Sequence, residues 1–498
     1  MATMVAVDLG AQSGRVALGR FDGRRLAVEE LHRFENVPVS AQGTLHWDVL
    51  RLFGGILEGL SAAEGRTTTV DSVGIDTWGV DFGLIDRAGR LIQNPVHHRD
   101  RRTEGAMGRV FGAVPARELY ERTGIQLMPI NTVFQLAAMV AAQDPVLEVA
   151  DRLLLMPDLF HYWLSGVVAS EFTNATTSQC LDARSETWAR DVLERLAIPD
   201  RVFPDVIRPA TVLGSLRGDV AERTRLRGAV VVAPATHDTA SAVAAVPLRH
   251  PDAVYISCGT WSLVGVERSA PLIDDRTFAA NLTNEGGVGG TFRVLRNVTG
   301  LWLLHECQRV WADAGASWDI VELLAMTGGA PALRSFIDPN DPVFLPPGDM
   351  PSRIREFCGR TGQEEPGDPA AVMRCILESL ALKHRQTIEL ISTATGVTPP
   401  EIHIVGGGAR NELLCRWTAD ATGMPVLAGP EEATVIGNLV VQAMGLGELA
   451  SLADAREVVR ASFSPVLYEP SDAAAWDEAY ARFERIAAGV EVPRGVAA

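Results

Sequence analysis

The chain has 498 residues, a formal net charge of −17, 47% apolar residues and 21% charged residues. These fractions are those of an ordinary globular protein, and the length exceeds what one hydrophobic core holds, so two domains of roughly 240 residues each are expected. The excess of acidic residues excludes a nucleic-acid binder of the usual kind, because such proteins present a basic surface.

Cysteine usage and hydropathy indicate where the protein works. Its six cysteines include no Cys-x-x-Cys pair, so neither a zinc site nor a redox pair is predicted. Dispersed cysteines are typical of a reducing cytosol. The first residues enter a strand without a basic and then apolar leader, and no apolar run reaches the length of a bilayer span. We therefore expect a cytoplasmic protein with neither a membrane nor a nucleic acid as partner.

The first predicted element is an apolar strand over 4–9, followed by a glycine-rich turn and a second strand. Glycines would let the backbone N–H groups of residues 10–14 surround a phosphate. Asp8 at the strand end can hold a hydrated Mg²⁺, and Arg15 can neutralise phosphate oxygens. The alternative is a tight hairpin in which Asp8 and Ser13 only cap the turn.

Strands and helices alternate over the next part of the chain. Apolar spacing predicts a strand over 26–34, a helix with one buried face over 47–60, a buried strand over 73–75, a hairpin of 82–85 and 90–92 with its turn at 86–89, and helices over 133–142 and 157–164. The segment 76–82 combines two acids with two aromatics. His97 and His98 fit a metal or anion site or a solvated loop, and we prefer the loop.

An apolar strand over 229–234 delivers His237, Asp238 and Thr239 at its carboxyl end, where ligands gather in α/β proteins. Asp238 is therefore predicted to accept a proton from a substrate hydroxyl. On local sequence alone, a helix cap is the simpler interpretation of Asp238. The phosphate-type turns before and after it in the sequence favour the catalytic interpretation.

Two of those turns lie in the second half of the chain. After a proline-flanked interdomain crossing at 247–252, a hairpin over 254–266 repeats the form of the first. A strand from residue 402 then runs through three glycines into a helix, where the backbone can approach a nucleotide. Such turns predict phosphoryl transfer, which needs positioning, a metal and one base. The segment 336–350 is predicted to be a surface loop or flap, and 473–488 a helix with a loose tail.

Several polar and aromatic residues near these turns are candidates for sugar contacts. Trp78, Phe82, Trp261 and Trp302 can form an apolar wall for a sugar, although large aromatics are more often core residues. Asn297 is predicted either to bind a sugar hydroxyl or to cap a helix.

From about residue 4 to about residue 463, the chain resembles the FGGY carbohydrate kinases, which belong to the actin, Hsp70 and hexokinase-like ATPase superfamily. The blocks that carry the resemblance are 75–86 (IDTWGVDFGLID), 122–136 (RTGIQLMPINTVFQL), 173–179 (TNATTSQ), 237–243 (HDTASAV), 259–263 (GTWSL), 281–287 (NLTNEGG) and 402–411 (IHIVGGGARN). The resemblance implies an α/β fold of two ribonuclease H-like domains, as in actin-like ATPases, with the active-site cleft between them. The expected division is 1–246, 253–465 and a C-terminal helix and tail over 466–498.

The resemblance also implies MgATP-dependent phosphorylation of L-rhamnulose at O1, by a monomer or small homo-oligomer. Asp238 would be the proton acceptor, and Asp8 would lie beside the metal. The positions implied to line the sugar are Gly79, His237, Asp238, Thr239 and Asn297. The positions implied to contact ATP are Ala11, Gln12, Ser13, Gly14, Arg15, Thr260, His305, Gly406, Gly407 and Gly408. His305 stands where the family has a glutamine.

Two alternatives stay open. Within the same class, the substrate can be another ketose or polyol, such as L-fuculose or D-xylulose. Outside it, the protein can be a non-catalytic sensor that binds sugar and ATP. A pure sensor does not need a carboxylate at position 238, so Asp238 argues for catalysis.

Overall fold

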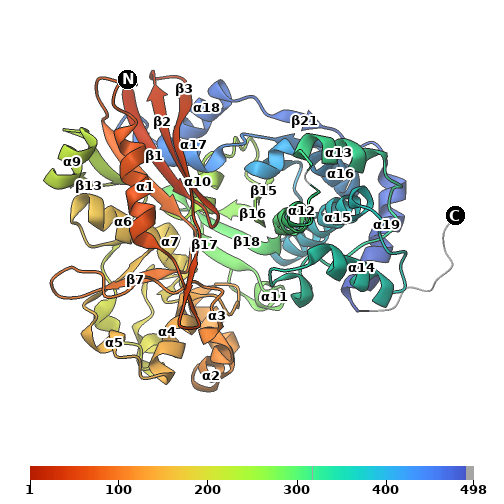
Figure 1. The fold of residues 1–498 in the computed structure, drawn as a ribbon, viewed down its shortest axis with the longest axis horizontal. Coiled ribbons are helices and arrows are strands. Elements are labelled where there is room, and N and C mark those ends of the chain that lie inside the picture. The colour runs from red at the N-terminus through yellow and green to blue at the C-terminus, as the bar shows by residue number, and fades with distance from the viewer. Residues whose placement is uncertain (317, 490–498) are drawn as a thin grey trace. The chain divides into compact units, whose positions relative to one another are not determined.

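The structure is a computed structural model that describes residues 1–316 and 318–489. They form two compact units (Figure 1). Unit 1 contains Met1–Pro247, Glu267–Leu295 and Ala433–Phe463, and unit 2 contains the remainder. Segments 267–295 and 433–463, which the sequence-based division assigns to the C-terminal domain, therefore fold with the N-terminal part. The tail expected after the last helix lies outside the described residues.

Unit 1 is built on a six-stranded sheet with the strand order β13-β14-β6-β1-β2-β3. These strands are β1 (Ala2–Leu9), β2 (Ser13–Phe21), β3 (Leu26–Glu35), β6 (Ser72–Thr77), β13 (Thr211–Ser215) and β14 (Val230–Ala233). β1 and β2 form the predicted antiparallel hairpin, whereas β6 lies parallel to both β1 and β14. The carboxyl ends of three neighbouring strands therefore meet at one edge of the sheet, as in α/β proteins that bind ligands there.

Helices cover both faces of this sheet (Figure 1). On one face, α1 (Val49–Ser61) and α6 (Met156–Ser165) enclose an apolar core with Val73 and Ile75 of β6. The Cα of Gly74 faces the opposite side of the sheet, where a Cβ would lie 2.9 Å from the side chain of Gln442 on α17 (Ala433–Gly445). The buried face of α1 is narrower than predicted, because Leu50 is 64% exposed.

Smaller pairs of strands and short helices complete unit 1. The strand pairs are β4 (Val39–Ala41) with β5 (Thr44–His46), β7 (Phe82–Ile85) with β8 (Arg152–Leu155), β9 (Ser170–Glu171) with β12 (Val206–Ile207), and β10 (Leu181–Asp182) with β11 (Thr187–Trp188). The helices are η1 (Arg101–Thr103), α2 (Ala106–Ala113), α3 (Ala116–Thr123), α4 (Thr132–Ala141), α5 (Val146–Val149), α7 (Phe172–Thr177), α8 (Arg190–Arg195), η2 (Asp200–Val202), α9 (Gly218–Thr224), α10 (Asp238–Ala244), α11 (Asp275–Ala279), η3 (Val288–Gly290) and α18 (Leu452–Ser462). The predicted turn at 86–89 is confirmed, because Gly89 N donates to the carbonyl of Asp86, Ile92 N donates to that of Leu84, and Leu91 forms an antiparallel bridge with Ile85. The segment 90–92 forms only this bridge, and the strand partner of β7 is β8.

Unit 2 repeats the strand order of unit 1. Its sheet contains β15 (Val254–Cys258), β16 (Trp261–Arg268), β18 (Phe292–Thr299), β19 (Ile402–Val405), β20 (Val426–Ala428) and β21 (Val466–Tyr468), and β18 begins in unit 1, where it pairs with β17 (Thr283–Gly286). β15 pairs antiparallel with β16 and parallel with β19, as β1 does with β2 and β6. The second phosphate-type hairpin predicted from the sequence is therefore present in the same topological position as the first.

Long helices accompany this second sheet. They are α12 (Trp302–Asp313), α13 (Ile320–Gly329), η4 (Pro342–Phe344), α14 (Met350–Arg360), α15 (Pro369–Thr395), η5 (Gly407–Arg410), α16 (Glu412–Thr422) and α19 (Ala473–Ala487). The segment 336–350 is not simply a surface loop, because Phe336, Ile337, Phe344 and Met350 are all fully buried. Their apolar side chains contribute to the core of unit 2.

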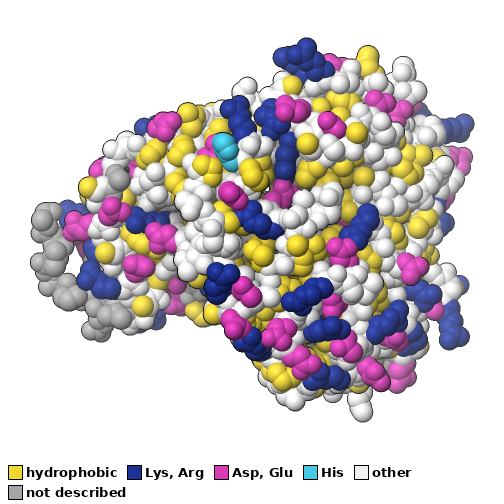
Figure 2. Space-filling view, turned by 180° about the vertical axis from the view of Figure 1, so that it is seen from behind, with side chains coloured by type: hydrophobic (Ala, Val, Ile, Leu, Met, Phe, Trp, Pro, Cys, Tyr) yellow, Lys and Arg dark blue, Asp and Glu magenta, His cyan; other side chains and the backbone are white. Residues whose placement is uncertain are grey.

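Charge on the described surface is mixed. On the face shown in Figure 2, Lys and Arg side chains are interspersed with Asp and Glu side chains. Within residues 1–316 and 318–489, no helix is long and apolar enough to cross a membrane.

At Gly437, α17 packs closely against α10, the helix that begins at Asp238. A Cβ atom at this position would lie 1.7 Å from the carbonyl oxygen of Ser241, so the two helices would have to separate. We expect Gly437→Ala to lower the free energy of unfolding by about 2 to 3 kcal/mol. Chemical denaturation would measure this. Gly108→Ala is the matched control, because Gly108 is at an exposed position of α2 and a Cβ there meets nothing within 4 Å, so no loss of stability is expected.

Candidate active site

Three acids lie at the carboxyl edge of the unit 1 sheet. Asp8 is the second-last residue of β1 and lies directly opposite Asp76 of the parallel strand β6. The chain after β14 continues this edge, since Thr77 N donates to the carbonyl of Thr236 at 2.9 Å and a bridge joins Thr77 to His237. The next residue is Asp238. The structure therefore brings together the predicted Asp8 and Asp238 and adds Asp76 between their strands.

The glycine-rich turn after Asp8 is a braced loop. Gly10 N donates to the carbonyl of Ser13 at 2.9 Å, and Asn36 holds the turn from outside with bonds to the carbonyls of Gly10 and Gln12, both at 2.9 Å. Arg15 Nη2 donates to Asp8 Oδ2 at 2.6 Å. The carboxylate of Asp8 therefore binds Arg15 and does not cap the turn. Ala11 and Gly14, which were also predicted to contact ATP, lie in the same hairpin.

Asp76 is an acid of this site that was not predicted as a site residue from the sequence. Its side chain is fully buried, and Asn438 of α17 donates to Oδ2 at 2.6 Å. Burial raises the pKa of Asp76 well above its usual range, and the charges of Asp8 and Asp238 raise it further, against Asn438 and Arg15. Segment 76–82 contains two acids next to two aromatics, and this pattern could have pointed to Asp76.

The elevated pKa of Asp76 predicts a pH-dependent effect of Asp76→Asn. An acid whose pKa is raised by folding stabilises the protein below the unfolded pKa of about 4, and this stability is lost as pH rises through the folded value. Asparagine keeps the bond from Asn438 and cannot ionise. We therefore expect the variant to gain stability over the wild type as pH rises from 4.5 to 8, by about 1.4 kcal/mol per unit of pKa elevation. Thermal unfolding across this pH range would measure it, and a pH-independent difference would contradict it.

Asp238 occupies the first turn of α10, and His237 is the N-cap residue. The carboxylate oxygen Oδ1 accepts from Thr239 Oγ1 at 3.0 Å and from the Thr239 amide. Burial raises the pKa of Asp238, with a further contribution from Asp8, while His237 opposes the shift. The side chain is still 30% exposed, so it can meet a substrate. The interpretation of Asp238 as the N-cap is wrong by one residue.

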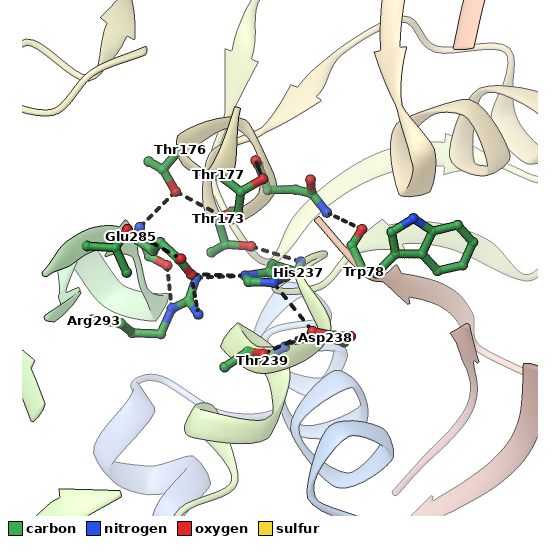
Figure 3. Close-up of polar contacts among 12 residues, drawn as sticks. Trp78, Thr173, Thr176, Thr177, His237, Asp238, Thr239, Glu285 and Arg293 are labelled. Atoms are coloured by element: carbon green, nitrogen blue, oxygen red, sulfur yellow. Dashed lines mark hydrogen bonds and ion pairs between the residues drawn. The ribbon is translucent and has the colours of Figure 1, made fainter. Parts of the chain in front are cut away.

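His237 and Thr239 flank this acid, and a buried network surrounds them (Figure 3). Glu171 accepts from Thr236 Oγ1 at 2.7 Å and from Thr236 N at 3.0 Å, which holds the end of β14 against α7. Gly79, another predicted sugar contact, lies against α7, because a Cβ there would be 2.8 Å from Thr177 Oγ1. Gly79, His237 and Thr239 therefore belong to one part of unit 1.

Asp81, just after Gly79, is the common hydrogen-bond acceptor of several buried side chains. Its Oδ2 accepts from Trp47 Nε1 at 2.7 Å and Trp78 Nε1 at 3.0 Å, and lies 2.7 Å from His98 Nδ1. Burial alone would raise the pKa of Asp81, but His98 and these hydrogen bonds lower it. The preferred interpretation of His97 and His98 as a solvated loop is wrong. Both are buried, and His97 stacks on Trp47 with centroids 4.0 Å apart.

The other predicted residues lie in unit 2. Gly300 N donates to the carbonyl of Thr260 at 3.0 Å, which joins the β15–β16 turn to the start of α12. The glycines 406–408 lie against the end of β15, because a Cβ on Gly408 would be 2.3 Å from Cys258 Sγ. Thr260 and this glycine loop therefore converge on the same end of the unit 2 sheet.

His305 and Asn297 complete the unit 2 residues. His305 lies one turn into α12, and burial lowers the pKa of its imidazole. Asn297 lies in strand β18, so its interpretation as a helix cap is wrong. Of the four candidate aromatics, Trp78, Phe82 and Trp302 are buried, and Trp261 is partly exposed.

Two family models match the chain, the N-terminal domain of the FGGY family of carbohydrate kinases over residues 3–245 and its C-terminal domain over 254–446. The chain belongs to the FGGY family of carbohydrate kinases. A protein of Bacteroides thetaiotaomicron named rhamnulokinase is 42% identical to this FGGY kinase. The match covers 96% of this kinase's chain and 98% of the relative's chain. A rhamnulokinase of Pectobacterium carotovorum is 40% identical over 99% and 98% of the two chains.

Solved structures share the fold of this FGGY kinase at low sequence identity. A gluconate kinase from Lactobacillus acidophilus superposes with a TM-score of 0.81 at 14% identity, and covers 98% of each chain. A xylulose kinase from the same organism gives a TM-score of 0.80, with 14% identity and the same coverage. The predicted two-domain, actin-like ATPase fold is confirmed. As a carbohydrate kinase, the enzyme takes a sugar and ATP as its small-molecule substrates.

Proposed function

We propose that this kinase transfers the γ-phosphoryl group of MgATP to O1 of L-rhamnulose, which gives L-rhamnulose 1-phosphate and ADP. The carboxylate of Asp238 carries the chemical part of this proposal, because it is mostly buried, partly open to substrate and held by Thr239 at the edge of the sheet. The name of the 42% identical relative supports the choice of sugar.

In the proposed reaction, Asp238 accepts the proton of the sugar hydroxyl as that oxygen attacks the γ-phosphorus. Phosphoryl transfer needs little more covalent help from a protein, and it depends on positioning and charge neutralisation. Gly79, His237, Thr239 and Asn297 are proposed to contact the sugar. The proposed ATP contacts are Ala11, Gln12, Ser13, Gly14, Arg15, Thr260, His305, Gly406, Gly407 and Gly408.

Asp8 is the proposed residue for Mg²⁺. A magnesium ion usually takes one or two protein carboxylates and completes its coordination with water and substrate phosphates. Asp8 at a strand end, opposite Asp76 in register and with a carboxylate that is 12% exposed, fits such an ion. Within the described residues, no group of three or more His, Cys, Asp or Glu side chains could hold a metal without substrate. When bound, Mg²⁺ would neutralise charge on the phosphates.

Steady-state ADP release with MgATP tests the function directly. The panel contains L-rhamnulose, L-fuculose, D-xylulose, L-ribulose, glycerol and no sugar. A strong preference for L-rhamnulose is expected. Preference for another ketose or polyol would keep the mechanism and replace the substrate. Sugar binding without ADP release would instead favour the sensor.

We also propose a cytoplasmic enzyme that acts as a monomer or small homo-oligomer. The division into 1–246, 253–465 and 466–498 stays a proposal for the domains along the sequence, from which the compact units differ because 267–295 and 433–463 belong to unit 1. The six cysteines are free and buried, which supports a reducing compartment. Light scattering of the purified protein would give the oligomeric state.

A further inference from the structure

A buried ion pair lies behind the imidazole of His237, on the side away from Asp238 (Figure 3). Arg293 is fully buried, and its Nη1 lies 3.1 Å from Glu285 Oε2. Both residues come from the β17–β18 pair, which belongs to unit 1 over this stretch. The active-site roles proposed above do not use either residue.

The guanidinium of Arg293 is held in one orientation and contacts His237. Its Nε donates to the carbonyl of Gly286 at 2.9 Å, and its Nη2 lies 3.1 Å from His237 Nδ1, within hydrogen-bond distance. A guanidinium can only donate, so a hydrogen bond between Nη2 and Nδ1 requires an unprotonated Nδ1 and therefore a proton on Nε2. Nε2 is 3.4 Å from Asp238 Oδ1.

Glu285 competes for the same nitrogen, because its Oε2 lies 3.3 Å from His237 Nδ1. A carboxylate alone would favour a proton on Nδ1. Glu285 is already paired with Arg293: burial would raise the pKa of Glu285, but the guanidinium lowers it, so the carboxylate stays charged and keeps Arg293 beside the imidazole.

We propose that Arg293, held by Glu285, is a positioning residue that keeps His237 as the Nε2–H tautomer and directs this N–H toward Oδ1 of Asp238. The inference rests on the proposed function, in which Asp238 is the base. Since Oδ1 accepts from the Thr239 amide and Oγ1 and also faces His237 Nε2 at 3.4 Å, the other carboxylate oxygen is left for the sugar hydroxyl.

The backbone of His237 is held independently of Arg293. His237 N donates to Thr173 Oγ1 at 3.2 Å, and Glu171 binds the preceding Thr236. Removal of Arg293 should therefore release the imidazole without displacing the strand end. The charged groups around Asp238 are then Asp8 and Asp76, on β1 and β6, with Glu285 behind His237.

The test combines ¹⁵N NMR of the imidazoles with kinetics on the full chain. His237→Gln assigns the His237 signals among the ten histidines. In the wild type at neutral pH we expect Nδ1 unprotonated and Nε2 protonated. Arg293→Met should lose this pattern and lower kcat about 10- to 100-fold with ATP KM unchanged, whereas Arg293→Lys, which keeps a donor, should retain most of both.

Two further variants make the outcome decisive. Arg456→Met removes another largely buried arginine of unit 1, paired with Glu267 at 2.6 Å, and should leave the His237 signals and kcat unchanged. Glu285→Gln removes the charge that keeps Arg293 beside the imidazole, so it should weaken the His237 pattern and lower kcat less than Arg293→Met does. It provides a test if Arg293→Met does not fold, and an unchanged pattern and kcat in Glu285→Gln would contradict the role of Glu285. A wild-type His237 protonated on Nδ1, or an unchanged tautomer in Arg293→Met, would overturn the proposal. If no sugar is phosphorylated, the proposed function fails, but the NMR result still decides the tautomer.

Discussion

Asp238→Asn is expected to fold normally and to lose about 10²- to 10⁴-fold in kcat, which corresponds to about 3 to 5 kcal/mol of activation free energy. The amide oxygen can still accept from the Thr239 amide and Oγ1, so the start of α10 should keep its conformation. The amide cannot accept the proton of the sugar hydroxyl. Coupled ADP release with saturating sugar and MgATP measures the loss.

The matched control for this variant is Asp86→Asn. Asp86 accepts from the backbone N–H groups of Ala88 at 2.8 Å and Arg90 at 2.9 Å in a surface turn, and asparagine can accept both bonds. We expect its kcat to equal that of the wild type. If Asp238→Asn also retained near-wild-type kcat, Asp238 would not be the base, and another acceptor would have to take the proton.

Asp81→Ala is expected to produce the largest loss of stability, about 3 to 5 kcal/mol. The substitution leaves the indole N–H groups of Trp47 and Trp78 and the ring of His98 without their common buried acceptor. Gln135 Nε2, which donates to the other carboxylate oxygen at 3.1 Å, loses a partner as well. Equilibrium denaturation by urea would measure the change in free energy of unfolding.

Glu104→Ala is the control for the loss of an acidic side chain in the same unit. Its carboxylate is 77% exposed and lies 3.9 Å from an exposed arginine, so the expected change stays within about 0.5 kcal/mol. Asp81→Asn should fall between the two, because it keeps an acceptor oxygen but introduces an amide N–H₂ among donors. Equal effects of Asp81→Ala and Glu104→Ala would show that the cluster around Asp81 does not stabilise the fold.

The parts of the fold that depend on local pattern could be predicted from the sequence. The glycine turn between β1 and β2, the apolar strand β14 before His237 and the helices α4, α6 and α19 follow from period, glycine and apolar runs within short windows. The same reasoning predicted the recurrence of the hairpin as β15 and β16.

The errors arise where distant segments meet. The strand partner of β7 is β8, about 70 residues later in the chain, and no local pattern predicts this partner in addition to the nearby segment 90–92. His97 and His98 are polar in isolation and become buried because Trp47 and Asp81 surround them. Polar side chains are buried when such partners are present, and the partners come from other elements.

The candidate site divides in the same way. Asp8 and Asp238 stand at strand ends that the sequence predicts, so their meeting at one sheet edge could be anticipated. The importance of Asp76 depends on its burial beside two other acids, and that of Arg293 on a contact with His237 across 56 positions of sequence. The roles assigned to the ATP and sugar contacts stay predictions until the variants and the substrate panel are measured.

The return of α17 to unit 1 has a consequence for how the chain is made. Asn438 and Gln442 on this helix hold Asp76, Ser72 and the Val5 carbonyl, yet they emerge from the ribosome roughly 190 residues after Pro247, about 10 to 40 s later at ordinary rates of translation. During that interval the N-terminal strands lack the helix that satisfies their buried polar groups. We expect the nascent N-terminal half to remain sensitive to proteases and to bind chaperones until α17 has been synthesised.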